Sequence, residues 1–205
     1  MGRVSKAQAT LNRQHIVETA CRLFRQHGVE GISIADIMAA AGLTPGGFYK
    51  HFASKEALVD EAFALAFQQA MDAWEQVARR ERKEGDSALA ALVRFYFRPR
   101  PLEKSCPMLA LAGAHEGQAP PAGAMVTYEQ GAQALLERFR TVARNAPAPA
   151  PGQALSKAEI DLLFAAMVGT GLLARSVGDA SWIRDLQTAV LDALPPGASS
   201  AGPAA

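Results

Sequence analysis

Apolar residues recur at helical spacing along most of the chain, and this pattern predicts an all-α fold with about nine helices. In the first segment, about 7–27, Ile16, Ala20, Leu23 and Phe24 fall on one helical face, and Gly28 follows the helix end. Two short helices are expected between residues 33 and 51. The remaining helices are expected at about 54–80, 86–98, 105–116, 123–145, 156–176 and 180–194.

Residues 33 to 51 have the caps and the turn of a helix-turn-helix. Ser33 is a favourable N-cap, and Asp36 three residues later completes a pattern like a capping box. Gly42 stands where the first short helix ends, a position that favours positive φ. Thr44 is a second N-cap residue, and Pro45 occupies the first position of the next helix.

The segment from Arg13 to Leu58 resembles the DNA-binding domain of the tetracycline-repressor (TetR/AcrR) family of bacterial transcriptional regulators. The matching pieces are RQHIVETACRLFRQHGVEGISIADI and AAAGLTPGGFYKHFASKEAL. The resemblance implies a three-helix helix-turn-helix DNA-binding domain at 1–53 and a helical effector-binding and dimerisation domain at 54–195. Residues 196–205, rich in Pro, Gly, Ala and Ser, are expected to be a disordered tail.

The resemblance also implies which residues bind DNA, with the helix after Thr44 entering the major groove and the starts of two helices meeting phosphates. We expect Phe48 and Phe52 to be core residues. Because Gly46 and Gly47 have no side chains, they permit close backbone approach but offer few base contacts, so specificity would rest on dimer spacing and DNA shape. The residues expected to bind DNA are Ser33, Thr44, Pro45, Gly46, Gly47, Tyr49, Lys50, His51 and Lys55.

The resemblance also implies an effector site within residues 54–195. Cys106 precedes Pro107 at a predicted helix start, where backbone N–H groups and nearby Lys104 favour a thiolate. Some electrophile- or oxidant-sensing family members resemble the chain here, and Arg175 stands where they carry a basic partner. Cys106 as a small apolar helix-start residue is an equal alternative. The other effector candidates, each also a candidate core residue, are Phe67, Phe95, Tyr96, Met108, Met125 and Tyr128.

A DNA-binding domain as small as residues 1–53 reads few base pairs, so a dimer on a palindromic operator is expected. The last two helices are expected to form the interface between the two copies. The same residues are alternatively core. The interface candidates are Phe164, Met167, Gly169, Gly171, Ile183, Leu186 and Val190.

Charge is distributed unevenly along the chain, with a basic N-terminal DNA-binding part and an acidic remainder. Residues 1–55 hold seven basic and three acidic residues, a net charge of +4, so with +1 for the whole chain the remainder carries −3. The two cysteines indicate a reducing, cytoplasmic setting. We expect no signal peptide and no apolar run near the roughly 20 residues of a membrane span. Neither a metal site nor a cofactor fingerprint is predicted.

These features predict a DNA-binding regulator without enzyme activity, most simply a repressor released from a palindromic operator by a small-molecule effector or by modification of Cys106. One alternative is a helical enzyme with Cys106 as nucleophile, for which His115, nine residues later, has poor geometry as a base. Another alternative is a helical dimer whose head does not bind DNA.

Overall fold

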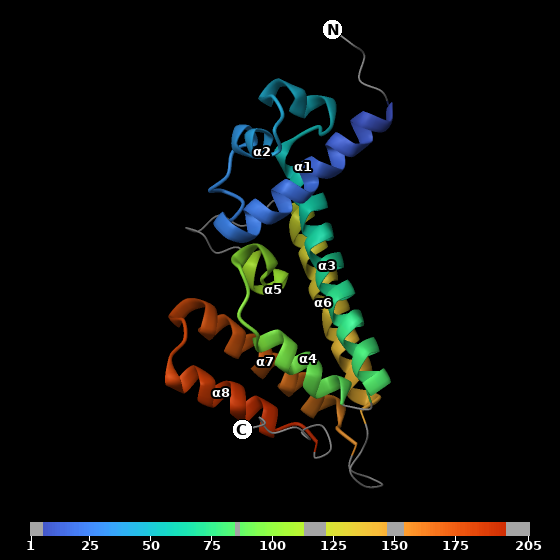
Figure 1. The fold of residues 1–205 in the computed structure, drawn as a ribbon, viewed down its shortest axis with the longest axis vertical. Coiled ribbons are helices and arrows are strands. Elements are labelled where there is room, and N and C mark those ends of the chain that lie inside the picture. The colour runs from blue at the N-terminus through green and yellow to red at the C-terminus, as the bar shows by residue number, and fades with distance from the viewer. Residues whose placement is uncertain (1–5, 85–86, 113–121, 147–153, 196–205) are drawn as a thin grey trace. The chain divides into compact units, whose positions relative to one another are not determined.

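The computed structural model describes residues 6–84, 87–112, 122–146 and 154–195, and it contains only helices and connecting segments over these ranges (Figure 1). The all-α prediction is confirmed. The expected tail at 196–205 and most of the Pro/Ala spacer at 145–154 lie outside the described residues. The helices are α1 (Lys6–His27), α2 (Ile34–Ala40), η1 (Pro45–Lys50), α3 (Lys55–Glu84), α4 (Ala88–Phe97), η2 (Leu102–Lys104), α5 (Pro107–Ala110), α6 (Ala122–Arg144), α7 (Lys157–Val177) and α8 (Ser181–Asp192).

Between residues 99 and 116 the structure differs from the prediction in one expected helix and in one additional turn. The helix expected at about 105–116 is the single turn α5, and the chain bends at residues 111–112, before the residues that the structure does not describe. The 3₁₀ turn η2 follows the RPRP break and was not expected. Pro101 directly precedes η2 and Pro107 begins α5, and because proline is not tolerated inside a helix, no longer helix runs through either position.

The chain divides into two compact units, residues 1–69 with 100–132 and residues 70–99 with 133–205. Helices α3 and α6 each contribute one part to each unit. The predicted division between residues 53 and 54 separates a DNA-binding domain from an effector-binding domain by function. It differs from this division by packing and remains a prediction.

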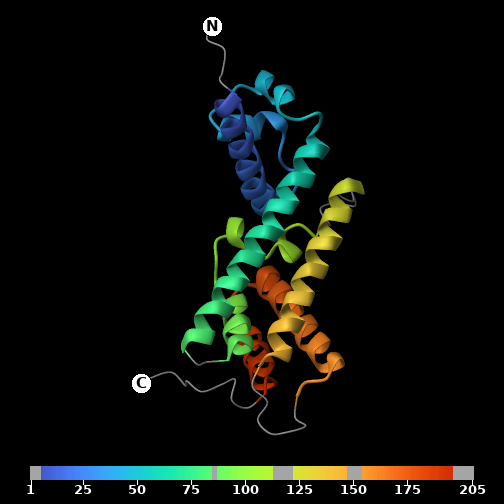
Figure 2. The ribbon, with the colours of Figure 1, turned by 90° about the vertical axis from the view of Figure 1, so that its right-hand side faces the viewer.

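The first unit has a continuous apolar core that joins α1, α2, η1 and the start of α3. Ile16, Phe24, Ile37 and Phe48 are fully buried in it. In Figure 2 the ribbon of α1, in dark blue, lies beside the teal start of α3. Outside this core, Arg13 on α1 makes a bidentate ion pair with Glu61 on α3, with 2.6 Å between Nη1 and Oε2. The apolar stripe predicted for the first helix therefore faces α2 and α3.

Helices α3 and α6 also meet within the first unit. The ring of Phe67 stands edge-on to Tyr128, with 5.5 Å between the ring centroids. Gly131 lies against the same Phe67 ring, and a Cβ atom built there would be 2.3 Å from Phe67 Cγ. The absence of a side chain at Gly131 is therefore what permits this close approach.

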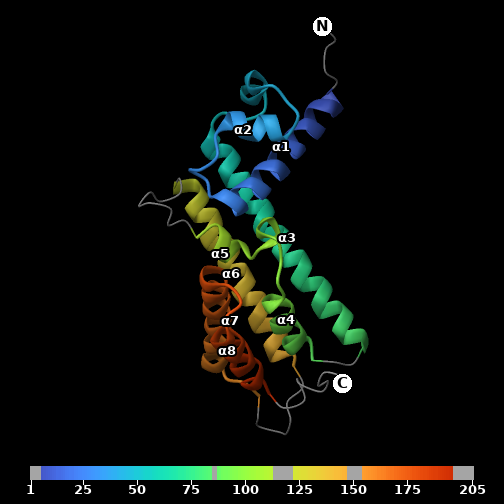
Figure 3. The ribbon, with the colours of Figure 1, turned by 60° about the vertical axis from the view of Figure 1, so that its left-hand side comes forward.

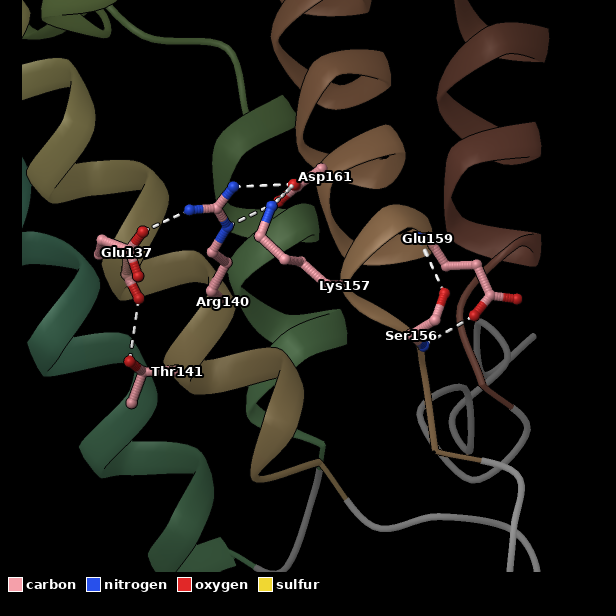
Figure 4. A network of polar contacts seen from close by, with 7 residues as sticks. All are labelled: Glu137, Arg140, Thr141, Ser156, Lys157, Glu159 and Asp161. Carbon is pink, nitrogen blue, oxygen red and sulfur yellow. Dashed lines mark hydrogen bonds and ion pairs between the residues drawn. The ribbon is translucent and has the colours of Figure 1, made fainter.

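The second unit is built on α4, α7 and α8, which lie side by side (Figure 3). Ser156 and Glu159, three residues apart, form a capping box at the start of α7 (Figure 4). The Arg140 guanidinium on α6 binds Asp161 on α7 with both Nε (2.6 Å) and Nη2 (2.8 Å), and Lys157 donates to the same carboxylate. These contacts fix the first turn of α7 against α6.

One described helix, α7, is long and apolar enough to cross a membrane by length and composition alone, so our expectation that no segment would pass this test was wrong. Core helices of soluble proteins pass the same test. Asp161 near its start is ion-paired with Arg140 on α6, and buried Thr170 interrupts the apolar sequence. The observation is weak support for a membrane span.

Candidate nucleic-acid interface

The first short helix begins with the predicted cap. The Ser33 hydroxyl accepts the Asp36 N–H (3.2 Å), and the Asp36 carboxylate accepts the Ser33 N–H (2.9 Å). The Asp36 carboxylate also accepts a hydrogen bond from the Ser33 hydroxyl, and this bond, followed by the one from the Ser33 N–H, lowers the pKa of Asp36. Both residues are exposed, and the Ser33 hydroxyl is engaged with Asp36. The phosphate contact predicted at this helix start stays a prediction, and it would use backbone N–H groups because the hydroxyl is engaged.

The turn between α2 and η1 has the geometry that its sequence predicts. Gly42 has φ of +68°, and its N–H donates to Ala39 O at 3.0 Å. Leu43 N–H donates to Met38 O at 2.8 Å, and its side chain packs against the core. The positive φ is accessible to glycine at little cost, which explains the residue at this position.

The segment predicted as the reading helix is the 3₁₀-helix η1 rather than an α-helix. Thr44 stands at its N-cap with an extended backbone, but its side chain makes no capping hydrogen bond, contrary to the prediction. Pro45 gives the first turn no N–H to donate, and the two glycines favour helix weakly, so the segment closes with short-range bonds such as Gly47 N–H to Thr44 O at 2.9 Å.

The reading surface, which we define as residues 44–47 and 49–51, is exposed except for half-buried Gly47 and His51. Phe48, in its middle, is completely buried and stacks on Phe52 with 5.5 Å between centroids, as predicted for core residues. Tyr49 is 70% exposed although it contacts the Phe48 ring edge-on. A buried anchor thus presents a tyrosine and a lysine outward on a small rigid surface.

The glycines of the reading surface are not required by the backbone. A Cβ atom at Gly46 would meet nothing within 4 Å, and one at Gly47 would make ordinary contacts of 3.6 Å with Met38 and 3.8 Å with Thr44. Neither glycine is among those with positive φ. The fold alone gives no reason for Gly at either position.

Lys55 has a partner within the protein that the sequence did not indicate. Its Nζ donates to Val29 O at 2.8 Å and so ties the start of α3 to the segment between α1 and α2. The ammonium group retains other N–H donors. A phosphate contact by Lys55 in addition to the hydrogen bond to Val29 O stays a prediction.

The effector candidates fall into the two compact units. In the first unit, the Tyr128 hydroxyl donates to Met108 O at 2.7 Å and the Tyr128 ring meets Phe67, whereas Met125 is 41% exposed. In the second unit, half-buried Phe95 and Tyr96 end α4, where Tyr96 stands edge-on to Trp74 at 6.4 Å.

Cys106 and Arg175 are each half-buried, Cys106 in the first unit and Arg175 in the last turn of α7 in the second. Their pairing remains a prediction. Because α5 is only four residues long, its dipole is too short to supply the effect expected at Cys106. His115, the base in the enzyme alternative, lies outside the described residues.

Three interface candidates are core residues of their own unit. Met167, Ile183 and Val190 are buried, which agrees with the alternative that they are core residues, and their role at a dimer interface stays a prediction. Phe164 is half-buried and packs edge-on against Phe139 at 5.4 Å. When a helix has apolar residues on all its faces, its sequence does not indicate which face packs against the core. Of the candidates, Leu186 is exposed and Gly169 and Gly171 are half-buried.

Other apolar side chains on α7 and α8 are exposed instead, and the sequence prediction did not include them. They are Leu162, Leu172, Leu173, Val177 and Trp182.

Comparison with known proteins places the head in a family. Residues 16–62 match the family described as bacterial regulatory proteins, tetR family. The N-terminal part of the chain is therefore similar to the DNA-binding segment of TetR/AcrR regulators. The chain is 44% identical over 66 residues to the HTH-type transcriptional regulator AcrR of Shigella flexneri, covering 32% of this chain and 31% of AcrR. It is 39% identical over 61 residues to the HTH-type transcriptional repressor KstR2 of Mycobacterium tuberculosis, covering 30% of each.

The chain thus spans about a third of the length of the curated relatives that it matches, and the match is confined to less than a third of the chain. The fold is shared over a much longer stretch. A TetR-family regulator from Agrobacterium tumefaciens superimposes with a TM-score of 0.73 at 20% identity, covering 91% of this chain and 99% of that one. At this identity the likeness concerns the fold alone.

Proposed function

We propose that this chain is a DNA-binding transcriptional regulator of the TetR/AcrR family, a repressor that binds its operator through the reading surface. The observation that carries the proposal is the exposed Tyr49 and Lys50 beside completely buried Phe48. The net charge of +4 over residues 1–55 favours approach to phosphates. The relatives named above are regulators, and this supports a cytoplasmic protein without enzyme activity.

The test is binding to the DNA upstream of the protein's own gene, measured by fluorescence anisotropy over a series of salt concentrations. We expect Lys50→Ala to cost about 1–3 kcal/mol, the value for a lost base contact, and Tyr49→Ala to weaken binding as well. Arg98→Ala removes one exposed positive charge from the second unit and is the matched control, which should bind as the unchanged protein does. Unchanged affinity in both head variants would contradict the proposed interface.

Two copies of the chain would bind a palindromic operator together. The support is the set of exposed apolar side chains on α7 and α8, since monomeric proteins rarely leave extended apolar patches in water. The interface would therefore use residues such as Leu162 and Leu172 rather than buried Met167. Gly169, where a Cβ atom would meet nothing within 4 Å, leaves room for close helix approach.

Release from the operator would follow binding of a small molecule or modification of Cys106. Effector and operator must then weaken each other's binding by the same factor, because coupling between two sites is reciprocal. For a small-molecule effector, calorimetric titration with and without operator DNA tests this. Equal affinity in the two titrations would exclude release by that molecule.

A further inference from the structure

Arg25, on α1, is a buried arginine whose hydrogen-bond partners carry no charge. Only 4% of the residue is exposed. Its Nη2 donates to Ala66 O on α3 at 2.7 Å, and its Nη1 donates to Glu103 O on η2 at 3.0 Å. Its Nε is buried and has no hydrogen-bond partner among the described residues. A buried cation held only by two carbonyls is costly to the fold, so a further partner for its charge would be stabilising.

Both cysteines of the chain lie in the electrostatic field of this guanidinium. Burial lowers the pKa of Arg25, and its interactions with the thiols of Cys21 and Cys106 act in the opposite direction. Cys21, one helical turn before Arg25, is buried and lies 3.9 Å from Gln69 Oε1. Cys106 follows Glu103 by three residues and is half-buried. It is therefore the thiol that a reagent can reach.

Other charged or titratable groups surround Cys106. The pKa of Tyr128 on α6 is raised by burial and by Cys106. Glu103 on η2 opposes a negative charge on the sulfur, but its carboxylate accepts a hydrogen bond from Gln26 Nε2 at 3.1 Å. Lys104 is exposed, so solvent weakens its effect. Among these groups, Arg25 is the buried cation.

We propose that Arg25 is the positioning residue for Cys106: its buried charge favours the thiolate of Cys106, and its two carbonyl contacts pass a change at that sulfur to α1. The inference rests on the proposed sensing role of Cys106. A guanidinium beside a sulfur favours the thiolate, and the thiolate is the reactive form. Arg25 thereby supplies the positive charge that the single turn α5 is too short to provide.

The contacts of Arg25 explain how a modification would reach the head. An adduct on Cys106 adds volume close to η2, where Arg25 binds the Glu103 carbonyl, and it removes the negative charge that the guanidinium favours. The two hydrogen bonds to Ala66 and Glu103 hold the last turns of α1 against α3 and η2. Phe24, next to Arg25, belongs to the core that also buries Phe48 under the reading surface. Displacement of Arg25 therefore loosens a helix on which the reading surface rests.

The test is alkylation of the full-length protein with iodoacetamide as a function of pH, in a Cys21→Ser background that leaves one thiol. The thiolate sulfur attacks the CH₂ carbon, the C–S bond forms, and iodide leaves with the C–I electron pair. We expect Arg25→Gln to move the midpoint of the rate profile upward by about one pH unit, slowing the reaction about tenfold at neutral pH. Arg25→Lys keeps the charge and should retain most of the rate. Lys104→Gln, which removes a neighbouring exposed charge, is the matched control and should change the rate less than about twofold.

An unchanged profile in Arg25→Gln would overturn the proposal, as would a larger shift in Arg175→Gln. If Arg25→Gln does not fold by circular dichroism, the comparison is between the folded Cys21→Ser protein and the same chain in urea. The proposal requires the lower midpoint in the folded protein, and an equal or higher one refutes it. Because no DNA is present, failure here is distinct from failure of the proposed operator binding.

The second part of the proposal is tested by amide hydrogen exchange. Alkylation of Cys106 should speed exchange of the amides in the last turns of α1, next to Arg25. An unchanged exchange rate there would show that the modification does not reach α1.

Discussion

Replacement of the two glycines in the reading surface by alanine separates the needs of the fold from those of DNA binding. A Cβ atom at Gly46 projects into open space, and one at Gly47 makes contacts of 3.6 and 3.8 Å that require no rearrangement. Because alanine restricts the unfolded chain more than glycine, each substitution should stabilise the protein by about 0.4–1 kcal/mol. For a chain of this size, 1 kcal/mol corresponds to a rise in Tm of roughly 2–4 °C.

The same methyl groups should weaken operator binding. Gly46 is exposed on the reading surface beside Tyr49 and Lys50, and an added Cβ atom there would hold the backbone away from the DNA. If close approach is the reason for the glycines, we expect each alanine variant to lose at least about tenfold in affinity, or 1.4 kcal/mol.

The assay pairs thermal denaturation with anisotropy of a labelled operator at one salt concentration. Gly123→Ala is the matched control, because Gly123 is also exposed, lies outside the reading surface on α6, and would place its Cβ atom in open space. It should bind operator DNA normally. The reasoning is refuted if Gly46→Ala and Gly47→Ala bind with unchanged affinity, or if they destabilise the fold.

Three further predictions concern residues outside the reading surface. Gly131→Ala should lower the free energy of unfolding in urea by about 1–3 kcal/mol because its Cβ atom would overlap the Phe67 ring, and Phe67→Leu should restore part of the loss; equal stability with and without the added methyl would contradict this packing. The pKa of Asp161 is held below its ordinary value by hydrogen bonds, first from Arg140, so its stabilising contribution is present above about pH 4 and is lost as the pH falls further; the difference in Tm between the protein and Asp161→Asn should shrink below pH 4, and a constant difference would refute the ion pair. In sedimentation velocity, Leu172→Glu should give monomers while Leu102→Glu, an equally exposed leucine on η2, should not; a dimer in both would place the interface elsewhere.

The sequence by itself determined the local features of this protein. The capping boxes at Ser33 and Ser156 and the positive φ of Gly42 were predictable, because each depends on residues within one or two turns of the chain. The burial of Phe48 and Phe52 was also predictable, since large aromatic residues at helical spacing seldom stay in water. The family resemblance added the roles of the residues around them.

Tertiary structure decided what depends on distant neighbours. An apolar helix such as α7 has more than one face that can pack, and only the arrangement of α4 and α8 buried Met167 and left Leu172 exposed. Arg25 was detectable as a cation on the apolar face of α1, one turn after Cys21, but its acceptors lie on α3 and η2, 41 and 78 residues away in sequence. A hydrogen bond between residues so far apart leaves no periodic signal in the sequence, because it arises only when separate helices pack together.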